Sequence, residues 1–483
     1  MPLPTIPSGN VASATAATGY TVDNSCRFSG SDDRLVRDAT GTSTESNNKW
    51  TFSCWVKRGK LGAEQMLVDH RSSGSAQFNI RFMSDDSLQA YDVVGGSVLM
   101  QKDTTAKYRD PSAWMHILWS SDRSISSPTT KLWVNGTEVT SWATDNEYSQ
   151  DDTGTANSDA PTWIGEENSS GSNFEGYLAE MVWLDGTFVS NATDFGEFDE
   201  DSPTIWKPKD VSGLTFGTNG WYLDFKDSAN LGNDANGGTD FGETGIAAAD
   251  QALDSPTNNF ATWNSLYMPT DTAVTFSEGN CKVVSQNASG KYWGAASTIG
   301  ITAGKWYAEF EATSADNKPV FGIVGNPNKK AKDGDWIGEE ADGYGYVADG
   351  GKYNNNTENA SWGSTFTAGD VISVAVDITN LKIYFAKNGT WQDSGDPTSG
   401  STGTGAAFTI LTPTSSSVHD KAYFFACSDQ STGGDTMSAN FGGCPAFTIS
   451  SGNADANGYG NFEYAPPSGY LALCTKNLGS DGG

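Results

Sequence analysis

The sequence predicts an all-β protein made of two β-sandwich domains joined by a Gly/Asn-rich linker. Three observations lead to this prediction. Apolar and polar residues alternate over many short stretches, which is the period of a strand. Asn-Gly pairs, which suit tight hairpin turns, follow several of these stretches. The apolar spacing of helices is almost absent. The chain has 483 residues, which is too long for one ordinary domain core and therefore indicates more than one domain.

Charge and hydropathy exclude several classes of protein. The 59 acidic residues outnumber 29 basic ones, so the net charge is −30, which repels nucleic acid phosphates. No apolar run approaches the roughly 20 residues that a membrane span needs, so we expect no membrane insertion. The N-terminus lacks the pattern of a signal peptide, which predicts synthesis in a cytosol. The six Cys residues include no CxxC pair, which favours buried thiols over a disulfide framework.

Residues 1–19 form an expected extended N-terminal arm, because their Pro, Ser, Ala and Thr residues bury little surface. The first sandwich is expected over residues 20–227. Its marks are the strand-like segments WTFSCWVK, WMHILW, LWVNGTEV with its Asn-Gly turn, and FEGYLAEMVW. In this order they resemble a laminin-G-like domain, a jelly roll of the concanavalin type.

A linker rich in Asn, Gly and Asp is expected at residues 228–269, and a second sandwich at 270–450. A meander of three strands is predicted within GDVISVAVDITNLKIYFAKNGTW, residues 369–391. Together with GKWY, VFGIV and GYGY, which precede it, this segment resembles a SPRY domain, a bent sandwich that binds partners through its loops. Residues 451–483 form a C-terminal extension in which the apolar run GYLALC can dock as an edge strand.

The whole arrangement resembles virion structural proteins of tailed phages, especially marine ones. The resemblance rests on the segments WKPK, GTNGWYLDF, DSPTNNFATWN and LALCTKNL. It implies a tail fibre or a capsid fibre or decoration at the virion surface, made in the host bacterial cytoplasm, and leaves open whether tail or capsid carries it. The N-terminal arm would attach to other virion proteins, and we expect a homo-oligomer, with a trimer as the first guess.

Catalytic patterns are scarce. Glucanases of the concanavalin type carry paired carboxylates as E-x-D-x-x-E on a strand. The nearest match to this pattern is the stretch EFDEDS at residues 197–202. It has Ser where the final Glu is required, and it is predicted as a loop or short helix rather than a strand. The three His residues are far apart, and neither a G-x-S-x-G elbow nor a phosphate-binding loop occurs. We therefore expect no enzyme and assign no catalytic residue.

Calcium is the one cofactor for which the sequence contains candidate ligands. Carboxylates crowd one predicted loop of the SPRY-like domain, and hard oxygen ligands suit Ca²⁺. The candidate ligands are Asp333, Asp335, Glu339 and Asp342, with Glu340 among them. A solvated acidic loop without metal is the favoured interpretation.

Sugar binding requires aromatic platforms beside planar polar groups. Six aromatic residues lie at or near predicted loops of the second domain: Trp336, Tyr344, Tyr346, Tyr353, Trp362 and Trp391. Loops on a rigid sandwich are where binding is expected, although core packing is the commoner role of such side chains.

The leading hypothesis is therefore a phage surface appendage whose lectin-like sandwiches bind host-surface glycans, host-surface proteins or virion proteins. One alternative is a purely structural capsid or tail decoration. A second alternative is a polysaccharide-degrading enzyme on a concanavalin-type fold.

Overall fold

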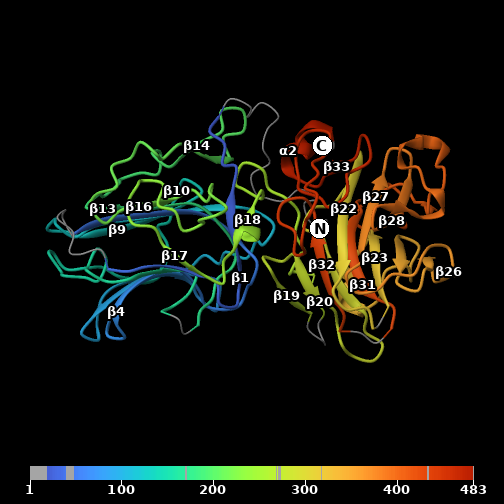
Figure 1. Ribbon diagram of the computed structural model, residues 1–483. Coiled ribbons are helices and arrows are strands. Elements are labelled where there is room, and N and C mark those ends of the chain that lie inside the picture. The colour runs from blue at the N-terminus through green and yellow to red at the C-terminus, as the bar shows by residue number, and fades with distance from the viewer. Residues whose placement is uncertain are drawn as a thin grey trace. The chain divides into compact units, whose positions relative to one another are not determined.

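The computed structural model describes residues 19–39, 48–168, 171–267, 269, 274–316, 318–431 and 434–481. The chain forms two compact units, an N-terminal unit that runs from Thr15 to Thr257 and a C-terminal unit that runs from Asn258 to Gly483. Strands make up nearly all the regular structure of both units, which confirms the all-β fold class (Figure 1). The predicted N-terminal arm lies outside the described residues except for Gly19.

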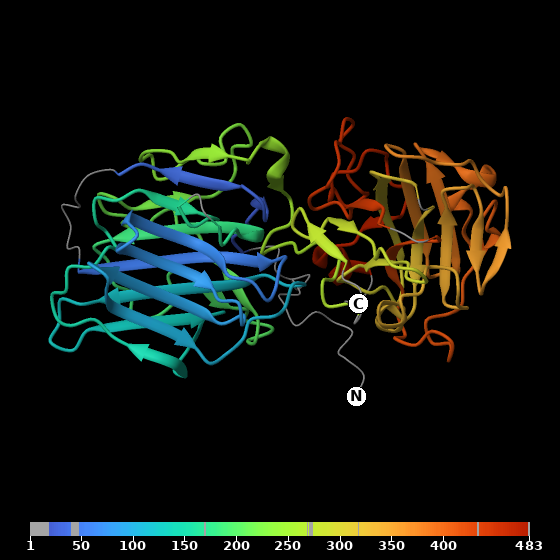
Figure 2. The ribbon, with the colours of Figure 1, turned by 90° about the horizontal axis from the view of Figure 1, so that it is seen from below.

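The N-terminal unit contains two antiparallel sheets. The first has the spatial order β10 (Thr137–Glu138), β9 (Thr129–Val134), β8 (Met115–Asp122), β3 (Lys49–Arg58), β13 (Glu175–Asp185), β1 (Ser25–Ser29) and β18 (Gln251–Ala252), with β16 (Trp221–Leu223) also paired to β13. The second, which Figure 2 shows face-on, has the order β11 (Trp142–Asn146), β7 (Ser97–Thr104), β6 (Leu88–Val94), β5 (Ala76–Phe82), β4 (Gln65–Ser73), β12 (Thr162–Ile164), β2 (Arg34–Arg37) and β17 (Gly242–Thr244). A separate hairpin joins β14 (Gly196–Phe198) to β15 (Trp206–Pro208).

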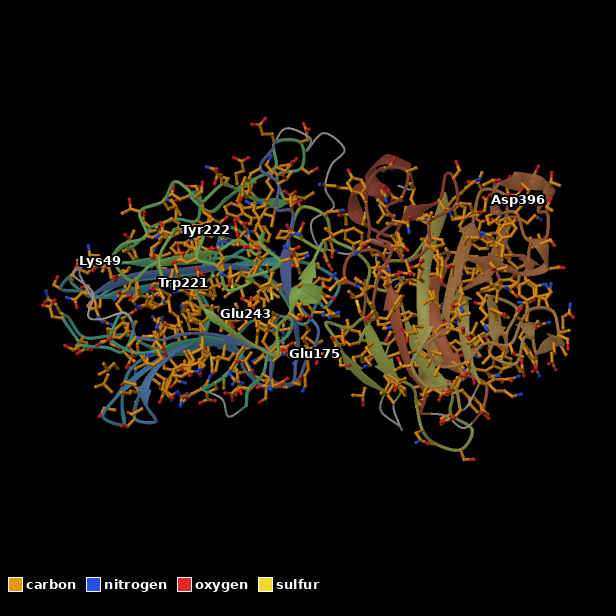
Figure 3. The ribbon with its side chains drawn as sticks, in the orientation of Figure 1. Lys49, Glu175, Trp221, Tyr222, Glu243 and Asp396 are labelled. Carbon is orange, nitrogen blue, oxygen red and sulfur yellow. The ribbon has the colours of Figure 1, made fainter. Side chains whose placement is uncertain are left out.

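Alternation along the strands builds the core of this unit. Trp221 on β16 is fully buried and its ring lies 6.5 Å from that of Phe52 in the core, whereas the next residue, Tyr222, donates a 2.7 Å hydrogen bond to Glu180 (Figure 3). The predicted turn between β9 and β10 is confirmed, because Asn135 and Gly136 have φ angles of 48° and 73°. All six Cys side chains of the chain are buried.

The predicted linker is wrong for residues 228–257, which belong to the N-terminal unit. Within this stretch β17 pairs with β2 and β18 pairs with β1, and a single 3₁₀ turn, η2 (Ala248–Asp250), precedes β18. Backbone pairing and a few buried side chains, among them Phe241, hold a segment whose composition is that of a loop. Such short strands lack the alternation that sequence patterns detect.

The C-terminal unit also contains two sheets. The first has the order β19 (Thr275–Ser277), β20 (Lys282–Val284), β32 (Thr436–Asn440), β22 (Lys305–Ala312), β27 (Val371–Asp377), β28 (Lys382–Lys387) and β29 (Thr390–Trp391), with β30 (Phe408–Thr409) paired to β28 and β33 (Leu471–Ala472) to β22. The second has the order β21 (Trp293–Ala296), β31 (Phe424–Asp429), β23 (Pro319–Val324), β24 (Gly343–Val347), β25 (Lys352–Asn354) and β26 (Thr357–Asn359). The helical segments are α1 (Pro327–Asp333), η3 (Gln392–Ser394), η4 (Pro397–Thr402) and α2 (Thr475–Asp481).

The predicted meander is confirmed by β27, β28 and β29, and its final turn at Asn388 and Gly389 has φ angles of 47° and 76°. Residues on both faces of β27 are buried. Ile372, Val374 and Val376 belong to the main core. Ala375 faces the other way, into a second cluster that the C-terminal segment supplies with Phe462, Tyr470 and Ala472.

The C-terminal extension is thus an integral layer of the C-terminal unit. Its predicted edge strand forms as β33, which pairs in parallel with β22. The carboxylate of Glu309 on β22 accepts hydrogen bonds of 2.8 Å from the backbone N–H groups of Glu463 and Tyr464 and a further bond from Tyr307. Burial raises the pKa of Glu309 to about 7, despite these donors.

Candidate functional site

A serine–histidine pair lies inside the N-terminal unit, but its hydrogen bonds do not suit nucleophilic catalysis. His116 Nε2 lies 2.8 Å from Ser53 Oγ, and Trp206 Nε1–H donates to His116 Nδ1 at 3.2 Å. Because an indole nitrogen only donates, Nδ1 must accept, so Nε2 carries the proton and Ser53 is the acceptor. Burial lowers the pKa of His116 to about 3, and both side chains are buried. This histidine cannot act as the base for Ser53.

The carboxylates predicted as calcium ligands do not form a metal site. No group of three or more His, Cys, Asp or Glu side chains within the described ranges is placed to hold a metal ion. Instead, the ammonium group of Lys329 is paired with Asp333 at 3.4 Å, with Asp335 at 3.6 Å and with Glu340. A lysine charge thus lies where the acidic loop would need a cation.

The other two predicted ligands lie apart from this pairing. Asp342 is buried, and Glu339 is half-buried. Burial raises the pKa of both carboxyl groups, and neighbouring acids add to the effect. Both groups therefore bind a proton more readily than an ordinary surface carboxylate does. The sequence pattern counted these acids but not the three lysines of α1.

Four of the six predicted binding aromatics are buried side chains of the core: Trp336, Tyr344, Tyr346 and Tyr353. Trp336 and Tyr353 contact each other edge to face, with centroids 4.9 Å apart. The two remaining residues, Trp362 and Trp391, are half-buried. Trp391 packs against the cluster beneath the C-terminal segment, so Trp362 is the member that we consider further.

Trp362 lies on a loop after β26 and is held from several sides. Its indole N–H donates to Asp393 at 3.3 Å. The ammonium group of Lys352 lies 4.9 Å from its ring centroid, within cation–π range. Tyr346 packs against the ring edge to face at 5.5 Å, and Phe385 does so at 6.1 Å. We call Trp362, Lys352 and Asp393 the Trp362 site.

The backbone around the Trp362 site adopts conformations that L-residues rarely take. Ser361, Asp393 and Ser394 have φ angles of 60°, 55° and 54°. Such left-handed residues persist only where surrounding contacts hold them, and they occur often at ligand sites. Here the Ser364 N–H donates to Gln392 at 2.8 Å, which ties the Trp362 loop to η3. The aromatic side chain and its acid are therefore fixed before any ligand arrives.

Charge at the Trp362 site is balanced within a half-buried environment. Lys352 donates to the Ala407 carbonyl at 2.7 Å and lies 5.2 Å from the Phe408 ring centroid. Burial lowers the pKa of Lys352, and the Asp393 carboxylate offsets part of this effect. The site offers an aromatic surface, a cation and an exposed carboxylate, which suits a neutral polar ligand with many hydroxyl groups.

Sequence reasoning found Trp362 but missed Lys352 and Asp393. Lys352 lies on a strand that no apolar alternation marks, and Asp393 follows Trp391 in a stretch without a recognised motif. The available signal was the segment NGTWQDSGD, where a tight turn is followed by a cluster of polar turn residues.

Family models match each unit separately. Residues 29–191 match the concanavalin A-like lectin/glucanases superfamily, and residues 305–419 match the SPRY domain. The predicted concanavalin-type and SPRY domains are therefore confirmed, in the predicted order. The Trp362 site lies within the SPRY match. A comparison with curated proteins gives no match.

Solved structures similar to this chain include three with different printed descriptions. The SPRY domain of human HERC1 is 20% identical, with 35% of this chain and 89% of that chain covered and a TM-score of 0.25. A putative carbohydrate binding protein from Bacteroides ovatus is 16% identical, with 47% and 60% covered and a TM-score of 0.32. A heptameric SAP-like pentraxin from Limulus polyphemus is 13% identical, with 35% and 78% covered and a TM-score of 0.27. Identities this low say nothing about a shared ligand.

Proposed function

We propose that this protein is a surface appendage of a phage virion and that its Trp362 site binds a glycan of the host surface. The observation that carries the proposal is a half-buried Trp on a loop of a SPRY domain, held between a lysine of β25 and an exposed aspartate of η3. The phage setting rests on the resemblance of segments such as GTNGWYLDF and LALCTKNL to virion proteins. No enzymatic activity is part of the proposal.

The chemistry of the site matches that of a sugar. An aromatic ring offers a large apolar surface for the C–H face of a pyranose, and a carboxylate beside it accepts hydrogen bonds from sugar hydroxyl groups. Because Trp362 is restrained by Tyr346 and Phe385, little side-chain entropy is lost on binding. A single site of this kind binds weakly, and many copies on one particle would raise the avidity.

A glycan array tests this function. The purified protein is expected to bind a subset of bacterial surface glycans, and Trp362→Ala is expected to weaken the binding at least about tenfold, as loss of a buried aromatic anchor does. Trp142→Ala is the matched control, because Trp142 is also half-buried and lies 5.5 Å from a lysine ammonium group, that of Lys102, in the other unit. If the wild type binds no glycan, or both variants bind alike, the proposed function is refuted.

The virion setting is tested separately. Antibody-gold labelling of whole particles is expected to mark the surface and to show whether the tail or the capsid carries the protein. Particles without the protein are expected to adsorb poorly to host cells. Normal adsorption would leave a purely structural role, and absence of label would refute the setting.

A further inference from the structure

A small polar hollow in the N-terminal unit is independent of the Trp362 site. It lies between β2, β4 and β12 of one sheet and β13 of the other, and residues 157–160 close one side. Its volume is about 10 Å³, close to that of one water molecule measured in the same way. Its lining residues are Arg37, Asp38, His70, Asn157, Ser158, Ala160, Thr162, Trp183 and Asn219. Asp38 is exposed, so the hollow reaches solvent on that side.

Two polar atoms of this lining have unused hydrogen-bonding capacity. His70 is 5% exposed, and its Nδ1 lies 2.9 Å from Thr162 Oγ1. Neither His70 Nε2 nor Ser158 Oγ, both buried, has a hydrogen-bond partner among the described residues. Burying such groups without partners is costly, which indicates that something small and polar occupies the hollow.

The other buried polar groups of the lining, unlike the exposed Asp38, are already engaged, and this narrows the choice of ligand. Arg37 donates to the Asn219 carbonyl at 2.7 Å and lies 4.0 Å from Asp234, so its charge is balanced. Asn157 accepts from Trp183 Nε1 at 2.8 Å. Burial lowers the pKa of His70 to about 3, so the ring is neutral and adds no charge for an anion.

We propose that the hollow is a second binding site that takes one hydroxyl group of a polyhydroxylated ligand such as a sugar. A hydroxyl group both donates and accepts, so it satisfies His70 Nε2 in either tautomer together with Ser158 Oγ. It fits the volume, which excludes a larger group. The rest of the ligand lies outside, on the side of Asp38, where its carboxylate accepts from further hydroxyl groups.

Histidine-selective ¹⁵N labelling provides the test, since the chain has three His residues. The probes are D-glucose, D-galactose, D-mannose and N-acetyl-D-glucosamine, with glycine betaine as a hydroxyl-free control. At least one sugar is expected to shift the His70 ring signals saturably. His116 serves as the internal control, because Ser53 and Trp206 already engage both of its ring nitrogens.

Two variants separate the possible outcomes. Ser158→Ala is expected to weaken sugar binding about three- to tenfold, the usual effect of one lost neutral hydrogen bond, while unchanged His116 signals show that the fold is kept. Trp362→Ala is expected to leave the His70 shift intact, so the two sites can succeed or fail separately. The proposal is refuted if no sugar shifts the His70 signals, in which case the hollow holds a bound water only. It is also refuted if the Ser158→Ala variant binds the sugar as tightly as the wild type does.

Discussion

A buried ion pair attaches the last residues of the N-terminal unit to its sandwich. The Asp254 carboxylate accepts from Lys57 Nζ at 2.6 Å and from Trp114 Nε1 at 2.8 Å, and the backbone carbonyl of Asp254 accepts from Ser25 at 2.6 Å. The side chains of Lys57 and Asp254 are each 1% exposed. The pair is therefore shielded from solvent, and the Asp254 carboxylate is a buried counter-charge of Lys57.

Asp254→Ala is expected to lower the free energy of unfolding of the N-terminal unit by about 3–5 kcal/mol, because it removes the counter-charge of a buried ammonium group. Glu138→Ala is the control in the same unit. Its partner Lys131 lies 3.0 Å away, but the two side chains are 32% and 41% exposed, so the expected loss is about 0–1 kcal/mol. The comparison separates a buried ion pair from an exposed one.

Urea unfolding followed by hydrogen exchange, with peptides read separately for each unit, measures both losses. The C-terminal unit should be unaffected. Replacing both partners, Lys57→Met with Asp254→Leu, is expected to recover much of the loss, since apolar residues often substitute for a buried pair. If Asp254→Ala costs no more than Glu138→Ala, the segment 228–257 is not held as described and the reasoning fails.

Three further predictions concern pH, metal and the buried serine–histidine pair. Burial raises the pKa values of Glu309 and Asp429 to about 7. Between about pH 4 and pH 7 these two carboxyl groups are therefore protonated in the folded C-terminal unit but ionised in the unfolded chain. The free energy of unfolding of the C-terminal unit should fall by about 2–3 kcal/mol for each unit by which the pH is raised from 5 to 7. A stability that rises over this range would contradict the prediction. A chelator should leave the melting temperature of the wild type unchanged. The melting temperature of the Lys329→Ala variant should rise when Ca²⁺ is added, because the acidic loop then lacks its lysine. Equal responses of the wild type and the variant to Ca²⁺ would count against the lysine pairing. Ser53→Ala should lower the free energy of unfolding by about 1–3 kcal/mol, because it leaves the His116 N–H unpaired, and should not change glycan binding. A variant that loses glycan binding but keeps its stability would contradict a purely structural role of this pair.

The sequence predicted the fold class because the long strands carry the alternation that burial imposes. β3, β8, β13, β22, β27 and β28 all fall where apolar residues recur at every second position. Elements held mainly by backbone pairing were missed. β17 and β18 have two or three residues each and lie in a Gly- and Asn-rich stretch, which reads as a linker.

The sites were less predictable, because their members come from distant parts of the chain. A count of aromatics in loops named Trp362 but could not separate it from Tyr346, which is fully buried directly behind it. A count of acids suggested calcium ligands, while Lys329 was ignored, although three residues of α1 separate it from Asp333. The hollow at His70 joins β4 to residues 157–160, and no local pattern relates the two.

Fluorine NMR of protein labelled with 5-fluorotryptophan tests the central claim, that a ligand is bound at Trp362. The glycan selected on the array is titrated into the labelled protein, and the signals of Trp362 and Trp142 are assigned by replacing each with Phe. The account predicts a saturable shift of the Trp362 signal and none for Trp142. A glycan that binds without moving the Trp362 signal would contradict it.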